Sequence, residues 1–124
     1  MNHIVIITAA ILGSTAIMLG AFGAHAFKKL ISEEKLASFE VGVRYQMYAA
    51  ITLLIIGFNL SFDLYSERFA FYGITLGTLL FSVSLYFLSF AQYWNKNLKF
   101  LGPITPLGGL LMIAGWVALI IRFI

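Results

Sequence analysis

The sequence has no cysteine, and this absence removes several kinds of chemistry. Without cysteine there is no disulfide framework, no thiolate nucleophile and no cysteine-based metal site. The two histidines, His3 and His25, fall near opposite ends of one long apolar segment without paired carboxylates, so no metal site is predicted. Nucleophile-elbow, phosphate-loop and dinucleotide-binding motifs are also missing. We therefore expect no cofactor and no enzymatic activity.

Charge is scarce as well. Only 10% of the 124 residues are charged, whereas 61% are hydrophobic, and the mean hydropathy is +0.96. Soluble domains have roughly 25% charged and 45–50% apolar residues. This chain has too few polar residues to cover a water-facing surface, so lipid must surround most of it. The net charge of +3 is too small and too scattered to indicate a nucleic-acid partner.

Four long apolar segments account for most of the sequence. They run over residues 4–27, 41–62, 69–93 and 102–121. A helix needs about 20 residues to cross a membrane, and strands of a membrane barrel are about 10 residues long with alternating hydrophobicity. The sequence therefore predicts an all-α integral membrane protein, with four transmembrane helices in one bundle and a single domain over residues 1–124.

The first apolar segment has a rival interpretation as a secretory signal peptide, because Ala24-His25-Ala26 resembles a cleavage site. Two features favour a transmembrane helix instead. No Lys or Arg precedes the apolar run, and the run is longer than the apolar core of a signal peptide.

Two connections have helical signals of their own. In residues 28–40, Ser32 is a plausible N-cap and two glutamates follow it, which favours a short interfacial helix; a solvated loop is the alternative. Before the fourth apolar segment, Pro103 and Pro106 suit the start of a helix. Because the residue before a proline avoids the helical conformation, we expect the regular helix to begin near Pro106.

The distribution of basic residues predicts the orientation. Lys28, Lys29, Lys35 and Arg44 follow the first span, Lys96 and Lys99 follow the third, and only Arg68 and Arg122 fall on the other side. Basic residues in short loops favour the cytoplasm. We therefore expect loops 28–40 and 94–101 to be cytoplasmic and both termini to be outside.

Small residues recur at helical spacing along the apolar segments. The candidates for helix packing are Ala16, Gly20, Gly23, Ala24, Gly73, Gly77, Gly108 and Gly109. Small residues let helix backbones approach each other in lipid. We favour contacts within one bundle over a seam between copies of the chain.

Polar residues gather near the predicted cytoplasmic interface. This candidate cluster comprises His25, Glu40, Arg44, Tyr45, Gln46 and Thr105. Polar groups at membrane depth are costly and are functional candidates by default. Anchoring of helix ends by snorkelling is the preferred interpretation, ahead of a clamp between the first two spans and of a proton or substrate site. Glu40 and Arg44 have the spacing of a helical ion pair.

Several motifs resemble the YgdD/YwdK family of small bacterial membrane proteins, whose eukaryotic relative is transmembrane protein 256. They are residues 20–26 (GAFGAHA), 42–48 (GVRYQMY), 77–82 (GTLLFS) and 102–109 (GPITPLGG), and they cover nearly the whole chain in order. The resemblance implies a four-helix protein of a bacterial plasma membrane and no established activity. Where the family pattern has His after Tyr-Gln-Met-Tyr, this chain has Ala49, which favours a packing role for that motif.

Three functional hypotheses remain open. The first is a non-enzymatic structural, scaffolding or envelope-maintenance role, as a homo-oligomer or with a larger membrane-protein partner. The second is a small transporter or channel subunit with its polar mouth at His25, Glu40 and Arg44, which requires a watery cavity past Tyr48. The third is binding of anionic membrane lipid, with headgroup candidates Lys28, Lys29, Arg44 and Lys96.

Overall fold

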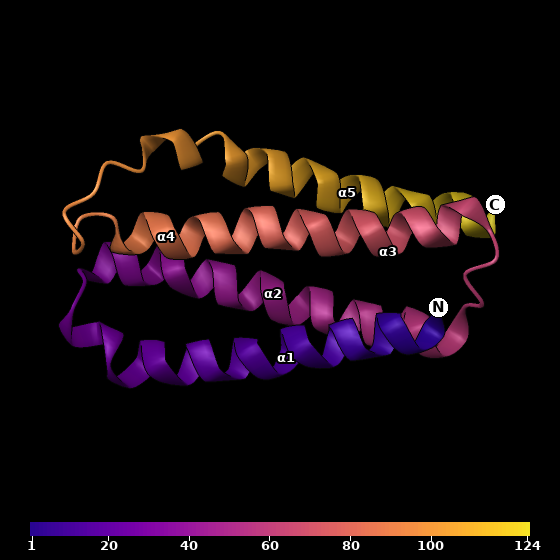
Figure 1. Cartoon of the computed structure of the whole chain (residues 1–124), viewed down its shortest axis with the longest axis horizontal. Coiled ribbons are helices and arrows are strands. Elements are labelled where there is room, and N and C mark those ends of the chain that lie inside the picture. Colours follow the sequence, from indigo (N-terminus) through magenta and orange to yellow (C-terminus); the bar gives the residue numbers. More distant parts are fainter.

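The computed structural model describes all 124 residues, and it consists of helices and the turns between them (Figure 1). The helices are α1 (Asn2–His25), α2 (Glu33–Asn59), α3 (Tyr65–Thr78), α4 (Ser84–Phe90) and α5 (Ile104–Phe123). Short 3-10 turns occupy Phe27–Lys29 and Lys99–Leu101, and a π-helical turn over Leu79–Val83 joins α3 to α4.

Because the π turn is continuous with both neighbours, residues Tyr65–Phe90 form one rod. The molecule thus has four rods that are long and apolar enough to cross a membrane. This confirms the predicted fold class. Both termini and the α2–α3 connection lie at one end of the bundle, which we call the terminal end (Figure 1). The other two connections lie at the opposite end, which we call the loop end.

Two helix starts differ from the sequence-based expectation. The charged segment after Ser32 is helical, but it is the first part of α2 rather than a separate interfacial helix. The Ser32 hydroxyl accepts a hydrogen bond from the Lys35 N–H at 3.2 Å, as expected for an N-cap. The expected start of the fourth helix near Pro106 is wrong, because α5 begins at Ile104. Pro106 lies in the first turn, where N–H groups lack intrahelical acceptors, so the proline is tolerated there.

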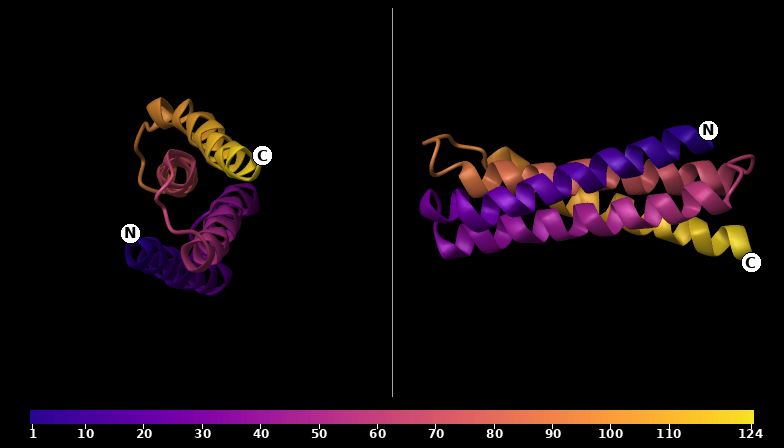
Figure 2. Two further views of the ribbon diagram at one scale, coloured as in Figure 1. Left: turned by 90° about the vertical axis from the view of Figure 1, so that its right-hand side faces the viewer. Right: turned by 90° about the horizontal axis from the view of Figure 1, so that it is seen from below.

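The rods are arranged as two hairpins. α1 packs along α2, α5 packs along α3, and α2 lies against the α3–α4 rod. Seen along the bundle, α1 and α5 are on opposite outer sides (Figure 2). α2 and the α3–α4 rod therefore form the centre of the molecule.

The interior is divided into levels along the bundle. The apolar core lies toward the terminal end and contains Val5, Ala9, Leu12, Ala49, Ala50, Leu53, Ile56, Leu60, Phe62, Phe71 and Ile74. Toward the loop end, aromatic rings fill the interior instead. Phe27 and Phe90 meet edge to face with ring centroids 4.9 Å apart, and Phe39 contacts Tyr86 at the same distance. A layer of polar side chains lies between the apolar core and these aromatic rings.

Candidate functional site

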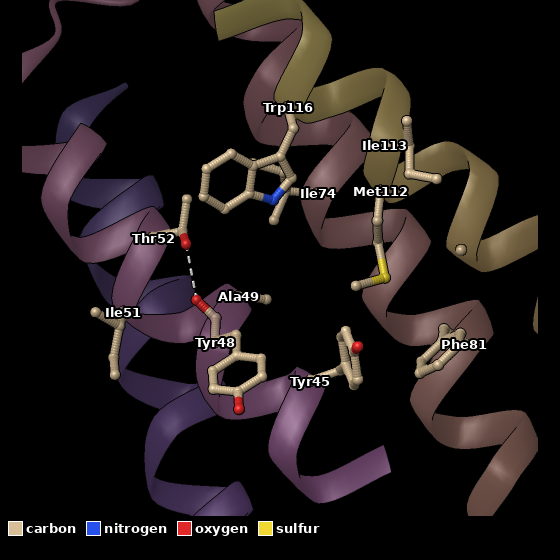
Figure 3. Close-up of a pocket in the computed structure, with 11 residues that line it drawn as sticks. Tyr45, Tyr48, Ala49, Ile51, Thr52, Ile74, Phe81, Met112, Ile113 and Trp116 are labelled. Carbon is tan, nitrogen blue, oxygen red and sulfur yellow. Dashed lines mark hydrogen bonds between the residues drawn. The ribbon is translucent and has the colours of Figure 1, made fainter. Parts of the chain in front are cut away.

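A groove on the flank of the bundle has a volume of about 670 Å³. It lies between α2 and α5, and the α3–α4 rod forms its floor (Figure 3). Nine of its eleven lining residues are hydrophobic. The lining residues are Tyr45, Tyr48, Ala49, Ile51, Thr52, Ile74, Phe81, Gly109, Met112, Ile113 and Trp116. Because these positions are in the middle of their helices, the groove opens sideways rather than at a bundle end.

Aromatic residues define the rims of the groove. Tyr48 on α2 and Trp116 on α5 are each 52% exposed, and they lie on opposite sides of it (Figure 3). Tyr45 packs edge to face on Tyr48 and on Phe81, with centroid distances of 5.4 and 5.2 Å. Small residues, Ala49 and Gly109, leave the space between the rims open.

The polar layer begins beside this groove, at Gln46. Its Nε2 donates to the Leu12 carbonyl at 2.9 Å and to the Thr15 hydroxyl at 2.7 Å. The Tyr86 hydroxyl donates to Gln46 Oε1 at 2.6 Å. Gln46 is 5% exposed, so one buried amide connects α1, α2 and α4.

Serines of the π turn and its neighbourhood extend the layer. Ser82 donates to the Gly42 carbonyl at 2.7 Å, and Ser84 shares a hydrogen bond with Thr105 at 2.5 Å. These contacts link the α3–α4 rod to α2 on one side and to α5 on the other. The hydroxyls of Thr75 and Thr78 are buried without a partner just before the π turn. A π-helical turn within an α-helix, such as Leu79–Val83 here, is frequent at functional sites.

The structure does not bring the whole predicted polar cluster together. Gln46 and Thr105 belong to the polar layer, and Tyr45 lines the groove. The other three members, His25, Glu40 and Arg44, are exposed, and the expected Glu40–Arg44 ion pair is not formed. Nowhere do three or more His, Asp or Glu side chains gather in a way that could hold a metal ion.

The predicted small residues occupy different environments. Gly73 and Gly77 of α3 lie against α5, where Gly108 and Gly115 face them. In α1, Ala16 is buried, Gly20 faces Val43 and Gly23 faces Phe39. Ala24 is exposed, and Gly109 is half-buried, with room for a Cβ that would contact the Phe81 ring at 3.7–3.9 Å. The close helix contacts of these glycines are therefore made within the chain.

Sequence reasoning missed one ion pair near the terminal end. Arg122 Nε donates to Glu67 Oε2 at 2.6 Å, and the Glu67 side chain is 1% exposed. Glu67 Oε1 also accepts from the Leu64 N–H at 3.3 Å. This position, three residues after the N-cap, is the one a capping carboxylate occupies. That spacing was a usable signal, but the pairing with Arg122 depends on how α3 and α5 pack.

Comparison with known proteins gives a consistent assignment. The family model described as "Protein of unknown function (DUF423)" matches residues 19–109. A UPF0382 membrane protein of Staphylococcus haemolyticus is 41% identical over 115 residues, which are 90% of each chain. The UPF0382 membrane protein YwdK of Bacillus subtilis is 39% identical over 119 residues, covering 94% of this chain and 92% of its own. No solved structure matches the chain.

The molecule has four helical rods that are long and apolar enough to cross a membrane, with a polar layer inside the bundle, and its relatives are named membrane proteins. These findings define its class as a polytopic α-helical membrane protein. Within that class, the chain belongs to the DUF423 family. The resemblance to the YgdD/YwdK family is confirmed by the match to YwdK.

Proposed function

We propose that this protein is a non-enzymatic membrane protein that holds the hydrocarbon chain of a membrane lipid in the groove between α2 and α5. The observation that carries the proposal is the groove itself, which is apolar, opens sideways and has a volume of about 670 Å³. Ligand pockets typically have volumes of about 300–1,000 Å³ and apolar linings. In a bilayer, such a surface faces acyl chains.

The shape of the groove favours a lipid chain over a helix as its occupant. Close helix packing in membranes needs small residues at the points of contact. Here the small residues are in the recess, and Tyr48 and Trp116 project beside them. Along α2 the groove runs from Tyr45 to Thr52, which is about 10 Å at 1.5 Å per residue. A narrow, flexible chain reaches the recess more easily than a second helix does.

The transport alternative receives less support from these contacts. A path for ions or polar solutes would need free polar groups beyond Tyr48. The lining there is almost wholly hydrophobic, and the Thr52 hydroxyl donates to the Tyr48 carbonyl at 2.8 Å. In the interior, Gln46 is fully engaged between α1 and α4.

One observation favours a scaffolding role as the second candidate. The most apolar stretch of α1 is only 22% buried within the chain, and the most apolar stretch of the span that contains α5 is buried to the same extent. Both outer helices therefore have large apolar faces available to a second copy or a larger membrane partner. Native-lipid particles that contain one copy of this chain and no other protein would count against this role.

For localisation, we propose the bacterial plasma membrane with loops 28–40 and 94–101 in the cytoplasm. The basic loop residues support this orientation. It places the loop end of the bundle at the cytoplasmic face.

Fluorescence can test whether lipid occupies the groove. The sequence has two tryptophans, so the Trp94→Phe variant leaves Trp116 as the only reporter at the rim. The purified variant is reconstituted in vesicles that contain a small fraction of phospholipid brominated on its acyl chains, because bromine quenches tryptophan emission on contact. We expect stronger quenching than random mixing of lipids gives.

A groove-filling variant provides the comparison. A Cβ added at Gly109 has only Phe81 atoms at 3.7–3.9 Å near it, so Gly109→Leu projects into the groove without a clash at its Cβ. We expect Gly109→Leu to reduce quenching to the random-mixing level, whereas Ala10→Leu, on the exposed face of α1, leaves it unchanged. Quenching that is identical in all three proteins, with matching circular dichroism spectra, would refute the proposal.

A further inference from the structure

We infer that the groove selects an anionic phospholipid, whose headgroup binds at Arg44 while one acyl chain lies between Tyr48 and Trp116. This inference rests on the proposed function and adds the class of lipid and the residue that selects it. It is carried by the level of Arg44 along the bundle, by the helix face it occupies and by the charge of the loop end.

Hydrogen bonds between the rods fix the level of Arg44. Gly42 is bonded to Ser82 and Gln46 to Tyr86, so Arg44, midway between them on α2, is level with Ser84. Ser84 is in turn bonded to Thr105, in the first turn of α5. Arg44 therefore lies at the height where α5 begins.

This height corresponds to one edge of the hydrocarbon layer. Glu67 and Ser84 are 17 residues apart on the same rod, which corresponds to about 26 Å at 1.5 Å per residue. A bilayer core is about 30 Å thick. If the Glu67–Arg122 pair, in which Glu67 is buried and Arg122 is partly exposed, is placed near one interface, Arg44 falls near the other, where phospholipid headgroups lie.

Arg44 also faces the groove. It precedes Tyr48 by four residues, and side chains four apart share a helix face. Tyr48 forms one rim of the groove, so Arg44 is one turn beyond that rim on the loop side. On the opposite side of the groove α5 begins at this height, and the 3-10 turn Lys99–Leu101 precedes it toward the loop end.

The guanidinium of Arg44 is available for a ligand. Arg44 is exposed, it makes no side-chain hydrogen bond in the structure, and the only ion pair of the chain is the one between Arg122 and Glu67. Glu40, one turn further from the groove, is the nearest acidic residue on the same helix face, and it is also exposed. Arginine binds phosphate oxygens with two parallel N–H donors.

The surrounding charge favours an anion at this end. The loop end has six basic residues and three acidic ones, whereas the terminal end has two of each. The entire formal excess of +3 therefore lies at the loop end. Lys96 and Lys99 are in the connection leading into α5, the helix that forms the opposite wall of the groove. Lys28 and Lys29 are in the connection between α1 and α2, and neither residue lines the groove.

The experiment compares two brominated lipids in the Trp94→Phe background. Phosphatidylglycerol and phosphatidylcholine with the same brominated chains differ only in headgroup charge. We expect the apparent affinity from Trp116 quenching to be at least about threefold higher for phosphatidylglycerol at low salt. Arg44→Gln should bring the ratio to one while leaving the quenching by phosphatidylcholine unchanged.

Two control variants distinguish lipid binding at Arg44 from general electrostatic attraction of anionic lipid to the protein. Lys28→Gln/Lys29→Gln removes two charges from the same end at residues that do not line the groove, and Arg68→Gln removes one from the terminal end. Both should keep the preference for phosphatidylglycerol. Equal quenching by the two lipids, or an equal loss of preference in Lys28→Gln/Lys29→Gln and in Arg44→Gln, would refute the selection of an anionic lipid. If the two lipids quench Trp116 equally and Gly109→Leu relieves the quenching by both, the groove function stands and the headgroup inference alone fails.

Discussion

At the scale of single residues, Gln46 has the largest structural role of the polar side chains. Its amide uses both the donor and the acceptor side, and its partners belong to two other helices: Leu12 and Thr15 of α1, and Tyr86 of α4. In a low-dielectric interior, unpaired polar groups are costly. The amide therefore fixes the register between the two hairpins as well as contributing to stability.

We predict that Gln46→Leu lowers the free energy of unfolding by about 1–3 kcal/mol, since hydrogen bonds between membrane helices contribute roughly 0.6 kcal/mol each and up to about 1.7. Tyr86→Phe should cost about 0.5–1.5 kcal/mol. The double variant should lose less than the sum, because Gln46→Leu already leaves the tyrosine hydroxyl unpaired. Unfolding by denaturing detergent, followed by circular dichroism, measures all three. Strict additivity would contradict the direct contact.

At the scale of secondary-structure elements, the π turn and the glycines opposite it determine how α5 packs. The first turns of α5 lie against Leu79–Val83. A Cβ added at Gly108 would clash with the Phe81 backbone nitrogen and would be 2.7 Å from the Gly77 carbonyl oxygen. The two backbones are thus in direct contact, and the groove beside them depends on this close approach.

Adjacent glycines of α5 give a matched pair of variants. Gly108→Ala should destabilise the protein by about 1–3 kcal/mol, because overpacking forces the backbones apart. Gly109→Ala meets only a side chain at 3.7 Å, and alanine is a better helix former than glycine. We expect that variant to be neutral or more stable by up to about 1 kcal/mol. The same detergent unfolding assay checks both, and equal losses in the two variants would argue against the observed α3–α5 contact.

At the scale of the whole molecule, the two hairpins share α2 and the α3–α4 rod as a central pair, and α1 and α5 remain on the outside (Figure 2). This open arrangement leaves the flank between α2 and α5 uncovered. It also puts both termini at one end. The orientation in the membrane then decides which leaflet meets Arg44 and which meets the Glu67–Arg122 pair.

Because the chain has no cysteine, single introduced cysteines report orientation directly. We predict that Lys35→Cys is not labelled by a membrane-impermeant maleimide in intact cells and becomes labelled after permeabilisation. Asp63→Cys, an exposed residue in the α2–α3 connection, should be labelled in intact cells. The reverse pattern would overturn the orientation, and the lipid in the groove would then belong to the opposite leaflet.

The sequence by itself determined that lipid surrounds most of the protein and that four helices cross the membrane. Few charges and four apolar runs leave lipid as the only surrounding that tolerates the chain, and these properties depend on composition and length rather than on contacts. Some local signals also act through neighbours in sequence, as Ser32 does by capping α2. The expected start of α5 near Pro106 is wrong because the first turn of a helix tolerates proline, so Thr105 is helical although a proline follows it.

Only the tertiary structure decided which polar residues meet. Gln46 and Tyr86 are 40 residues apart, and Glu67 and Arg122 are 55 apart, so their pairing follows from helix rotation and register. Those quantities depend on close contacts such as the one between Gly108 and the Phe81 backbone. The groove has the same origin, because it lies between α2 and α5 and neither helix has it alone. Hydrophobicity along a chain specifies that helices cross the membrane, whereas the packing of side chains between them specifies what the assembled surface can bind.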